Sequence, residues 1–243
     1  MENILAVLAT TTVLTPIIAG MSGAVLITNE FAYRHPKDPQ AVISSTWDLT
    51  SGSLFRLPDG TLWTGVPDRN AIDPASNTGT DSAQFRAVTA DRSYGDVSVA
   101  LTLTMRELTS TPRTPQVAWD GVHIMIRYAS QFNLYYASVV RRDGTIVMKK
   151  KCPGGPSNGG TYYKMTPYVT HPWQPEKEMH FKLTARNVPR GVQLQLFENG
   201  KPLLIADDLG KGIGKCPPIT QPGGIGVRGD NAEFMFKFQP TKM

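Results

Sequence analysis

The clearest pattern of apolar and polar positions lies in residues 119–151. Three runs there, roughly 122–128, 134–141 and 145–151, are rich in Val, Ile and Tyr, and this composition predicts three consecutive antiparallel strands. An Asp-Gly dipeptide at 143–144 joins the last two runs. A two-residue primed hairpin favours this dipeptide because both central residues need positive φ. The stretch therefore predicts a β-meander.

The first of these strands has two different faces. His123, Met125 and Arg127 fall on one side, and Val or Ile residues fall on the other. Such a strand covers a core with its apolar face and presents its polar face to a ligand. Tyr135 and Tyr136 are neighbours in the second strand, so at most one of them belongs to the core. We assign Tyr136 to the polar face with His123 and Arg127, and a register shift of one residue would reverse this assignment.

The chain from Val25 onward alternates between further strands and turns. Apolar alternation is strongest over 95–107, and Asn-Gly at 199–200 is a strong hairpin signal. The other predicted strands are 25–33, two short strands between 47 and 63, 83–88, 179–185, 191–198, 203–206, 224–227 and 234–238. Residues 66–82 form a long polar loop. No helical period follows the N-terminal region, and the pattern predicts an all-β antiparallel sandwich.

The N-terminal region is apolar. No charged residue lies between Glu2 and Glu30, a span long enough to cross a bilayer. Thr, Pro and Gly residues within this region weaken a membrane helix. A signal peptide requires Lys or Arg before its apolar segment, and neither residue precedes this one. We therefore predict that residues 1–24 form an apolar arm, packed against the domain or a neighbouring subunit, and that residues 25–243 form one domain. A targeting or anchor segment is the alternative.

Composition narrows the range of partners. The 243 residues suit one large β domain, and 40% apolar residues suffice to build its core. The net charge of +5 is mild, and the one tight basic run, Lys149–Lys151, is typical of a solvated strand end. We therefore expect no nucleic-acid partner.

The two cysteines, Cys152 and Cys216, each stand between Lys and Pro. One pair of cysteines in a β protein predicts a structural disulfide and an oxidising location. A loop of this length corresponds to about 4 kcal/mol in the chain-entropy treatment. Two buried free thiols are the alternative. No cluster of Cys and His supports a zinc site.

Four stretches of the second half, 119–128, 134–141, 194–202 and 223–238, resemble the concanavalin A-like lectin/glucanase superfamily in its laminin-G-like branch. The resemblance implies a jelly-roll sandwich of two curved sheets, one face of which carries a saccharide site in many relatives. The pattern is also similar to secreted domains of actinobacteria and to receptor-binding or tail modules of their phages. That similarity implies a cell-envelope glycan as partner and a location outside the cell, on its surface or on a virion.

Glucanases of this superfamily carry Glu-x-Asp-x-x-Glu on one strand, which places two carboxylates on one face. This chain lacks the motif. Glu176 and Glu178 form the closest glutamate pair, and their position after a proline is more typical of a solvated turn. His123 is the best isolated candidate base, but no Gly-x-Ser-x-Gly motif is present. We predict no catalytic residues and keep a glycoside hydrolase as a minor alternative.

Sugar recognition needs aromatic faces beside polar groups that bind hydroxyls. The available aromatic residues are Trp63, Trp119, Tyr135, Tyr136, Tyr162, Tyr163 and Trp173. The predicted ligand-binding set is Trp63, Trp119, Asp120, His123, Arg127, Tyr136 and Arg141. Each tryptophan has the alternative of packing in the core, since large aromatic residues dominate sandwich cores.

The resemblance also implies calcium, which is common among relatives and is bound by carboxylate and carbonyl oxygens. Asp230 and Asn231 lie near the last predicted strand, and Glu30 lies near the first. The three residues would converge if those strands pair. They are the candidate calcium ligands.

Three functions follow from these observations. The leading hypothesis is a non-catalytic domain that binds carbohydrate or cell envelope and is displayed on a cell or virion surface. The second is a structural virion protein, such as a phage minor tail protein, that oligomerises or assembles through residues 1–28. The third is a glycoside hydrolase.

Overall fold

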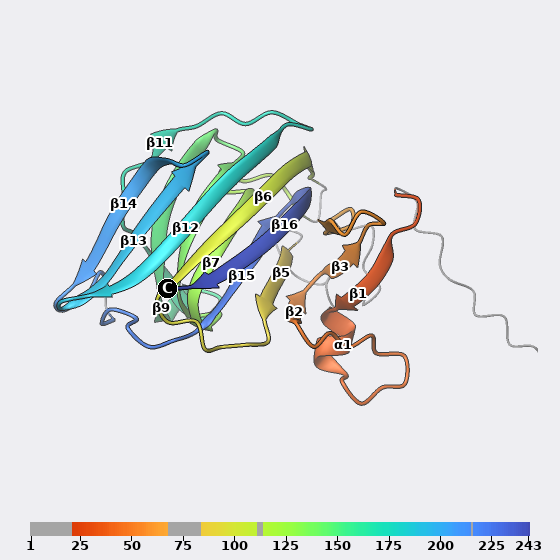
Figure 1. Cartoon of the computed structure of the whole chain (residues 1–243), viewed down its shortest axis with the longest axis horizontal. Coiled ribbons are helices and arrows are strands. Elements are labelled where there is room, and N and C mark those ends of the chain that lie inside the picture. The colour runs from red at the N-terminus through yellow and green to blue at the C-terminus, as the bar shows by residue number, and fades with distance from the viewer. Residues whose placement is uncertain (1–20, 68–83, 111–113, 215) are drawn as a thin grey trace, which may run out of the picture.

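The structure is a computed structural model that describes residues 21–67, 84–110, 114–214 and 216–243. Two antiparallel sheets form a sandwich, and Figure 1 shows their strands as two layers. Sheet A has the order β1 (Val25–Asn29), β3 (Ser53–Arg56), β4 (Leu62–Trp63), β16 (Ala232–Lys242), β6 (Val97–Leu108), β12 (Glu178–Val188), β13 (Gly191–Glu198) and β14 (Lys201–Leu209). Sheet B has the order β10 (Gly160–Lys164), β9 (Thr145–Ser157), β8 (Asn133–Arg141), β7 (Gly121–Ser130), β15 (Gly224–Asp230), β5 (Gln84–Thr89) and β2 (Trp47–Ser51). The expected all-β jelly-roll sandwich is confirmed.

The core lies between the two sheets and follows the alternation of their strands. In β6, every second residue from Val97 to Met105 is buried, and the residues between them are exposed or half-buried. Val122, Ile124 and Ile126 of β7 face this core from sheet B. Each fully buried aliphatic side chain of this kind contributes about 1.5–3 kcal/mol. The alternate apolar side chains that predict the strand at 95–107 are therefore also the ones whose burial holds the two sheets together.

The two dipeptide hairpin signals produce different turns. Asn199 and Gly200 both have positive φ, +49° and +78°, and join β13 to β14 as the two-residue primed hairpin expected. Between β8 and β9 only Gly144 has positive φ, +66°, and its N–H donates to the carbonyl oxygen of Arg141. Three residues, 142–144, separate these strands, so the expected two-residue turn is wrong. A turn followed by a left-handed glycine gives the three-residue loop instead.

The predicted strand over 25–33 is also wrong in its second half. It ends at Asn29, and the helix α1 (Glu30–Arg34) follows. The Asn29 side-chain oxygen accepts the Ala32 backbone N–H at 2.9 Å, which caps the helix. Glu30 and Arg34 pair one turn apart. A polar cap and one ion pair therefore override the strand pattern here.

The predicted disulfide is confirmed. Cys152 in β9 is bonded to Cys216, which lies between β14 and β15. Lys150 is fully buried beside it, and its ammonium donates to the Cys216 and Pro217 carbonyl oxygens at 2.8 Å and pairs with Asp208 at 2.7 Å. The Tyr135 hydroxyl donates to Asp208 and accepts the Ile219 N–H at 2.8 Å. We call Lys150, Asp208 and Tyr135 with these two carbonyl groups the interior cluster; it ties the segment after β14 to sheet B.

Of the predicted arm, residues 1–20 lie outside the described residues, so its assembly, targeting or anchor role stays a prediction. In the ranges that the structure describes, no helix has the length and hydropathy needed to cross a membrane.

Candidate functional site

A pocket of about 440 Å³ opens on the face of sheet B that is turned away from the core. The apolar part of its lining is Met125, Tyr128, Leu134 and Tyr136, which pack together as a cluster separate from the core. Trp119, half exposed, lines the pocket from the segment before β7. Ser157, the last residue of β9, and Asn158, in the turn to β10, also line it. The pocket is thus built on six neighbouring strands of sheet B, β5, β15, β7, β8, β9 and β10.

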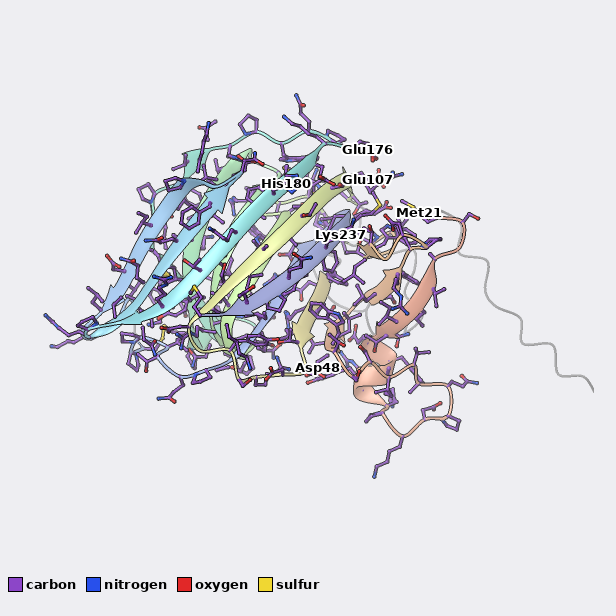
Figure 2. The ribbon with its side chains drawn as sticks, in the orientation of Figure 1. Met21, Asp48, Glu107, Glu176, His180 and Lys237 are labelled. Atoms are coloured by element: carbon purple, nitrogen blue, oxygen red, sulfur yellow. A yellow bond between two sulfur atoms is a disulfide. The ribbon has the colours of Figure 1, made fainter. Side chains whose placement is uncertain are left out.

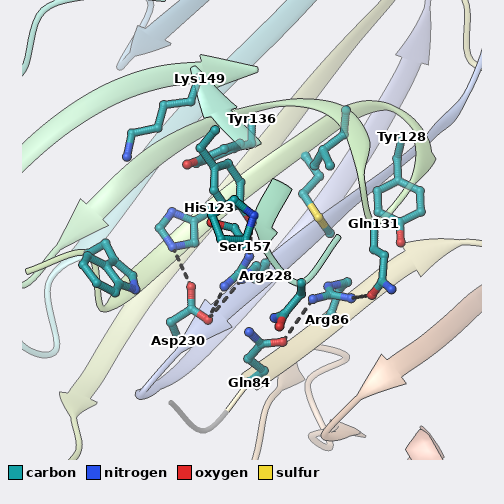
Figure 3. A pocket seen from close by; sticks show the side chains of 16 residues that line it. Gln84, Arg86, His123, Tyr128, Gln131, Tyr136, Lys149, Ser157, Arg228 and Asp230 are labelled. Atoms are coloured by element: carbon teal, nitrogen blue, oxygen red, sulfur yellow. Dashed lines mark hydrogen bonds and ion pairs between the residues drawn. The ribbon is translucent and has the colours of Figure 1, made fainter. Parts of the chain in front are cut away.

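Strand register arranges the polar lining in a row across the sheet. Arg86 of β5 is paired directly with Arg228 of β15, Arg228 with His123 of β7, and His123 with Ser138 of β8. Directly paired residues of antiparallel strands point to the same face. Figure 3 shows Arg86, Arg228 and His123 around the pocket.

His123 occupies the centre of this row with both ring nitrogens engaged. Its Nδ1 lies 2.9 Å from the Ser138 hydroxyl and its Nε2 lies 3.1 Å from Asp230 Oδ2. Burial lowers the pKa of His123 in spite of the carboxylate beside it. The ring is therefore neutral at pH 7, with the hydrogen on Nε2 directed at Asp230 and Nδ1 accepting from Ser138. It is a positioning group rather than a free base.

Asp230 links the histidine to Arg228. Its Oδ1 accepts from Arg228 Nε at 3.0 Å and from the terminal nitrogen Nη2 at 2.8 Å, a two-bond geometry visible in Figure 3. Burial would raise the pKa of Asp230, but the charge of Arg228 and the hydrogen bond from His123 outweigh burial and hold that pKa well below its usual value. Both carboxylate oxygens are thus occupied by side chains of the protein.

Tyr162 completes the row from β10. Its hydroxyl oxygen accepts from Arg228 Nη1 at 2.8 Å, and the Lys151 ammonium lies 4.7 Å from its ring centroid. Burial would raise the pKa of Tyr162, but the charges of Arg228 and Lys151 lower it below its ordinary value. The Tyr136 ring stands edge-on to both Tyr162 and His123, with centroids 5.5 and 5.6 Å apart. These contacts hold the aromatic side chains in one orientation.

Arg86 is held by neutral groups. Its two terminal nitrogens donate to Gln131 Oε1 and Gln84 Oε1, each at 3.0 Å (Figure 3). The side chain is buried, and burial together with the charge of Arg228 lowers the pKa of Arg86. The two glutamine amides therefore orient the guanidinium without neutralising it.

The predicted ligand-binding residues fall into two groups. Trp119, His123 and Tyr136 line the pocket. Asp120 is buried and accepts from the Val117 N–H and from Arg142 Nε, each at 2.9 Å. Arg141 is buried and pairs with Asp143 at 2.6 Å.

The two remaining predicted residues lie in other parts of the sandwich. Arg127 is fully buried with φ +52°, which breaks the alternation of β7, and it bonds the Thr220 and Gln221 carbonyl oxygens and Asp96. Trp63 lies buried in sheet A, where its indole N–H donates to Glu233 at 2.9 Å.

The candidate calcium ligands lie at the ends of strands that do not pair: Glu30 begins the helix after β1, and Asp230 and Asn231 lie where β15 ends and β16 begins. β1 pairs with β3, and β3 and β4 stand between it and β16. Glu30 pairs with Arg34, Asp230 bonds His123 and Arg228, and the Asn231 amide nitrogen faces the Asp120 carboxylate at 3.2 Å. No group of three or more His, Cys, Asp or Glu side chains in the described residues could hold a metal ion. Calcium stays a prediction.

Sequence reasoning missed the pocket's cations. Arg86, Arg228 and Lys149 line it together with Gln84 and Gln131. Arg86 lies inside a predicted strand and Arg228 directly follows another. Only the pairing of β5 with β15 brings them together, and no local pattern signals that pairing.

Comparison with known proteins gives the fold. No protein-family model and no curated protein matches the chain. A solved structure from work on endo-acting O-glycanases that members of the human gut microbiota express to initiate mucin breakdown matches 85% of this chain and 96% of its own, with TM-score 0.54 and 9% identity. The legume lectin-like domain from Entamoeba histolytica matches 82% of this chain and 90% of its own, with TM-score 0.48 and 7% identity. The VIP36 exoplasmic/lumenal domain in its Ca²⁺/Man3GlcNAc-bound form matches 82% and 84%, with TM-score 0.47 and 11% identity. The chain has the fold of the concanavalin A-like lectin/glucanase superfamily, as its sequence suggested.

Proposed function

We propose that the protein binds a glycan chain in the pocket of sheet B and does not hydrolyse it. The observation that carries this proposal is the composition of the pocket: an accessible tryptophan, three tyrosines and several planar hydrogen-bonding groups line one open cavity. Aromatic faces pack against the C–H groups of a sugar, and amide and guanidinium groups bind its hydroxyls. The shared fold with a structure from work on O-glycanases supports a glycan ligand, at the level of fold.

The arrangement of carboxylates argues against hydrolysis. Glycosidases place two carboxyl groups about 5–9.5 Å apart across the scissile bond. Among the described residues that line the pocket, Asp230 is the one carboxylate, and both of its oxygens are held by His123 and Arg228. Glu176, the first member of the glutamate pair, pairs with Arg106 at 3.0 Å beside sheet A, where Figure 2 shows it near Glu107. A glycan would therefore find hydrogen-bond donors in this pocket and no acid–base pair.

The proposal includes display outside the cell, on a cell or virion surface. The disulfide between Cys152 and Cys216 supports an oxidising environment. A polysaccharide or cell-envelope glycan is the partner that such a location offers.

The test compares binding by two variants to a panel of immobilised polysaccharides and cell-envelope extracts. Trp119→Ala removes the exposed ring at the pocket and should weaken binding about tenfold, because truncating a tryptophan that becomes buried on binding costs more than about 1 kcal/mol. Phe197→Ala is the matched control, since its half-buried ring lies on sheet A under the Lys182 ammonium. It should leave binding unchanged.

Absence of binding to every polysaccharide and extract would exclude the proposal. Equal losses in both variants would place the ligand elsewhere. Release of reducing sugar ends during the assay would show hydrolysis and contradict the non-catalytic part.

A further inference from the structure

Among the described residues, the buried cations elsewhere in the sandwich have carboxylate partners. The pairs are Arg127 with Asp96 at 2.9 Å, Arg141 with Asp143 at 2.6 Å and Lys150 with Asp208 at 2.7 Å. Arg86 and Lys151 are buried too, but in the part of the chain that the structure describes neither forms an ion pair with a carboxylate. Arg86 bonds glutamine amides, and Lys151 lies over the rings of Tyr162 and Phe132. Arg86 lines the pocket, and Lys151 lies directly behind Tyr162, another residue of the lining.

The pairing of β5 with β15 adds a like-charge contact. Arg86 stands directly opposite Arg228, and like charges in directly paired positions destabilise a sheet. Asp230, the carboxylate at the end of β15, is committed to Arg228 and His123. Lys149 adds another positive charge to the lining. The described lining therefore carries three cations against one carboxylate that is already engaged.

Burying a charge without a partner is costly, and an anion bound at the pocket would offset that cost. Guanidinium groups bind planar carboxylates through two parallel hydrogen bonds, and both Arg86 and Arg228 retain N–H donors beyond those used within the protein. Trp119 and the glutamines supply the contacts that a sugar ring needs. These features describe the recognition of an acidic sugar.

We propose that the glycan of this pocket is acidic, a polyuronate whose sugar carboxylate is bound between Arg86 and Arg228. The inference rests on the glycan-binding function proposed above and names the chemical class of its ligand. It also assigns the paired arginines their role: they are held close together, at a cost to stability, because the ligand supplies the missing negative charge.

The first experiment uses the unaltered full chain. Binding is measured by calorimetry to polygalacturonate, to the same polymer after chemical reduction of its carboxyl groups, to a sulfated galactan and to a neutral glucan. We expect polygalacturonate to bind at least about tenfold more tightly than its carboxyl-reduced form, since hydrogen bonds to charged groups contribute about 1.5–3 kcal/mol. The affinity should also fall as the salt concentration rises.

The second experiment uses Arg86→Gln, with Arg186→Gln as control because Arg186 is an exposed residue of β12 in sheet A. Arg86→Gln should weaken polygalacturonate binding about tenfold, while its melting temperature stays equal to or above that of the original chain. A merely structural arginine would lower the melting temperature on removal. Arg186→Gln should leave affinity unchanged.

The outcomes separate this inference from the proposed function. Equal affinity for polygalacturonate and its carboxyl-reduced form overturns the acidic ligand and leaves glycan binding intact. Preference for the sulfated galactan overturns the carboxylate assignment. Failure to bind any of the four polymers or the wider panel overturns both proposals together.

Discussion

The two sides of strand β9 carry two very different clusters of charge. Lys150 points inward into the interior cluster, where its ammonium is bonded to Asp208 and to two carbonyl oxygens. Of its neighbours in the chain, Lys149 lines the pocket and Lys151 lies over the ring of Tyr162, a lining residue. The one lining carboxylate among the described residues is already paired with Arg228. Neighbouring lysines of one strand therefore differ: the charge of Lys150 is neutralised by a carboxylate, and the charges on the pocket side are not.

This difference separates structural from binding roles. An ammonium group has three donors, and the interior cluster supplies an acceptor for each. Nothing is left for a ligand. The pocket instead holds Arg86 with two neutral amides and leaves its charge unneutralised. Because both cations are buried, burial alone would give both a structural role. What distinguishes the two sites is whether a carboxylate neutralises the buried positive charge.

The largest effect should come from breaking the interior cluster. Lys150→Met leaves the buried Asp208 without its cation, and removing one partner of a buried pair costs about 3–5 kcal/mol. Urea unfolding of this variant and of Arg86→Gln measures the contrast in the free energy of unfolding. Arg86→Gln should lose little or gain stability. Equal losses in the two variants would contradict the distinction between the clusters.

The disulfide should give the next largest effect. Replacing Cys152 and Cys216 by serine should cost about 2–4 kcal/mol. Because Cys216 also supplies a carbonyl oxygen to Lys150, the disulfide and the interior cluster fix the same segment. Combining this change with Lys150→Met should therefore cost less than the sum of the separate losses. If urea unfolding shows that the two losses in the free energy of unfolding simply add, the disulfide and the interior cluster act independently. The pocket should keep most of its glycan affinity in the cysteine variant, since neither cysteine lines it.

Local patterns predicted most of the fold. The alternation of β6 and the Asn199-Gly200 hairpin are properties of neighbouring residues, and both were predicted correctly. The β8–β9 turn and the start of α1 were not, because Gly144 alone takes positive φ and Asn29 caps a helix that the apolar pattern hides. In each case one hydrogen bond or one backbone angle decides between two conformations of similar energy.

The site was less predictable because it depends on strand order. His123 and Tyr136 were placed on one face from alternation, and the structure brings their rings within 5.6 Å. Arg127 was grouped with them by the same rule, but its positive φ turns it toward Asp96 instead. Arg86 enters the site only because β5 pairs with β15, a contact between segments more than a hundred residues apart. Periodicity specifies a face and says nothing about which strand lies beside it.

The smallest predicted effect concerns the neutral histidine of the pocket. Burial lowers the pKa of His123 below its ordinary value of 6.5 in the folded protein, against the opposing influence of Asp230. As the pH falls below 6.5, the unfolded chain therefore takes up a proton at this residue before the folded protein does. The free energy of unfolding should therefore decrease as the pH is lowered through this window, by up to about 1.4 kcal/mol per pH unit.

The measurement is urea unfolding at several pH values between 7 and 5, for the original chain and for His123→Gln. The variant should lose this part of the pH slope, whatever its stability at pH 7, because glutamine does not titrate. His180→Gln is the control, since that side chain is exposed on β12, where Figure 2 places it on sheet A. An unchanged slope in His123→Gln would contradict the lowered pKa of His123, and a steeper loss of stability toward low pH in the variant would show that the pocket histidine is already protonated at pH 7. Asp230 would then be balanced by two cations, and the positive surplus of the pocket would be larger than the neutral ring implies.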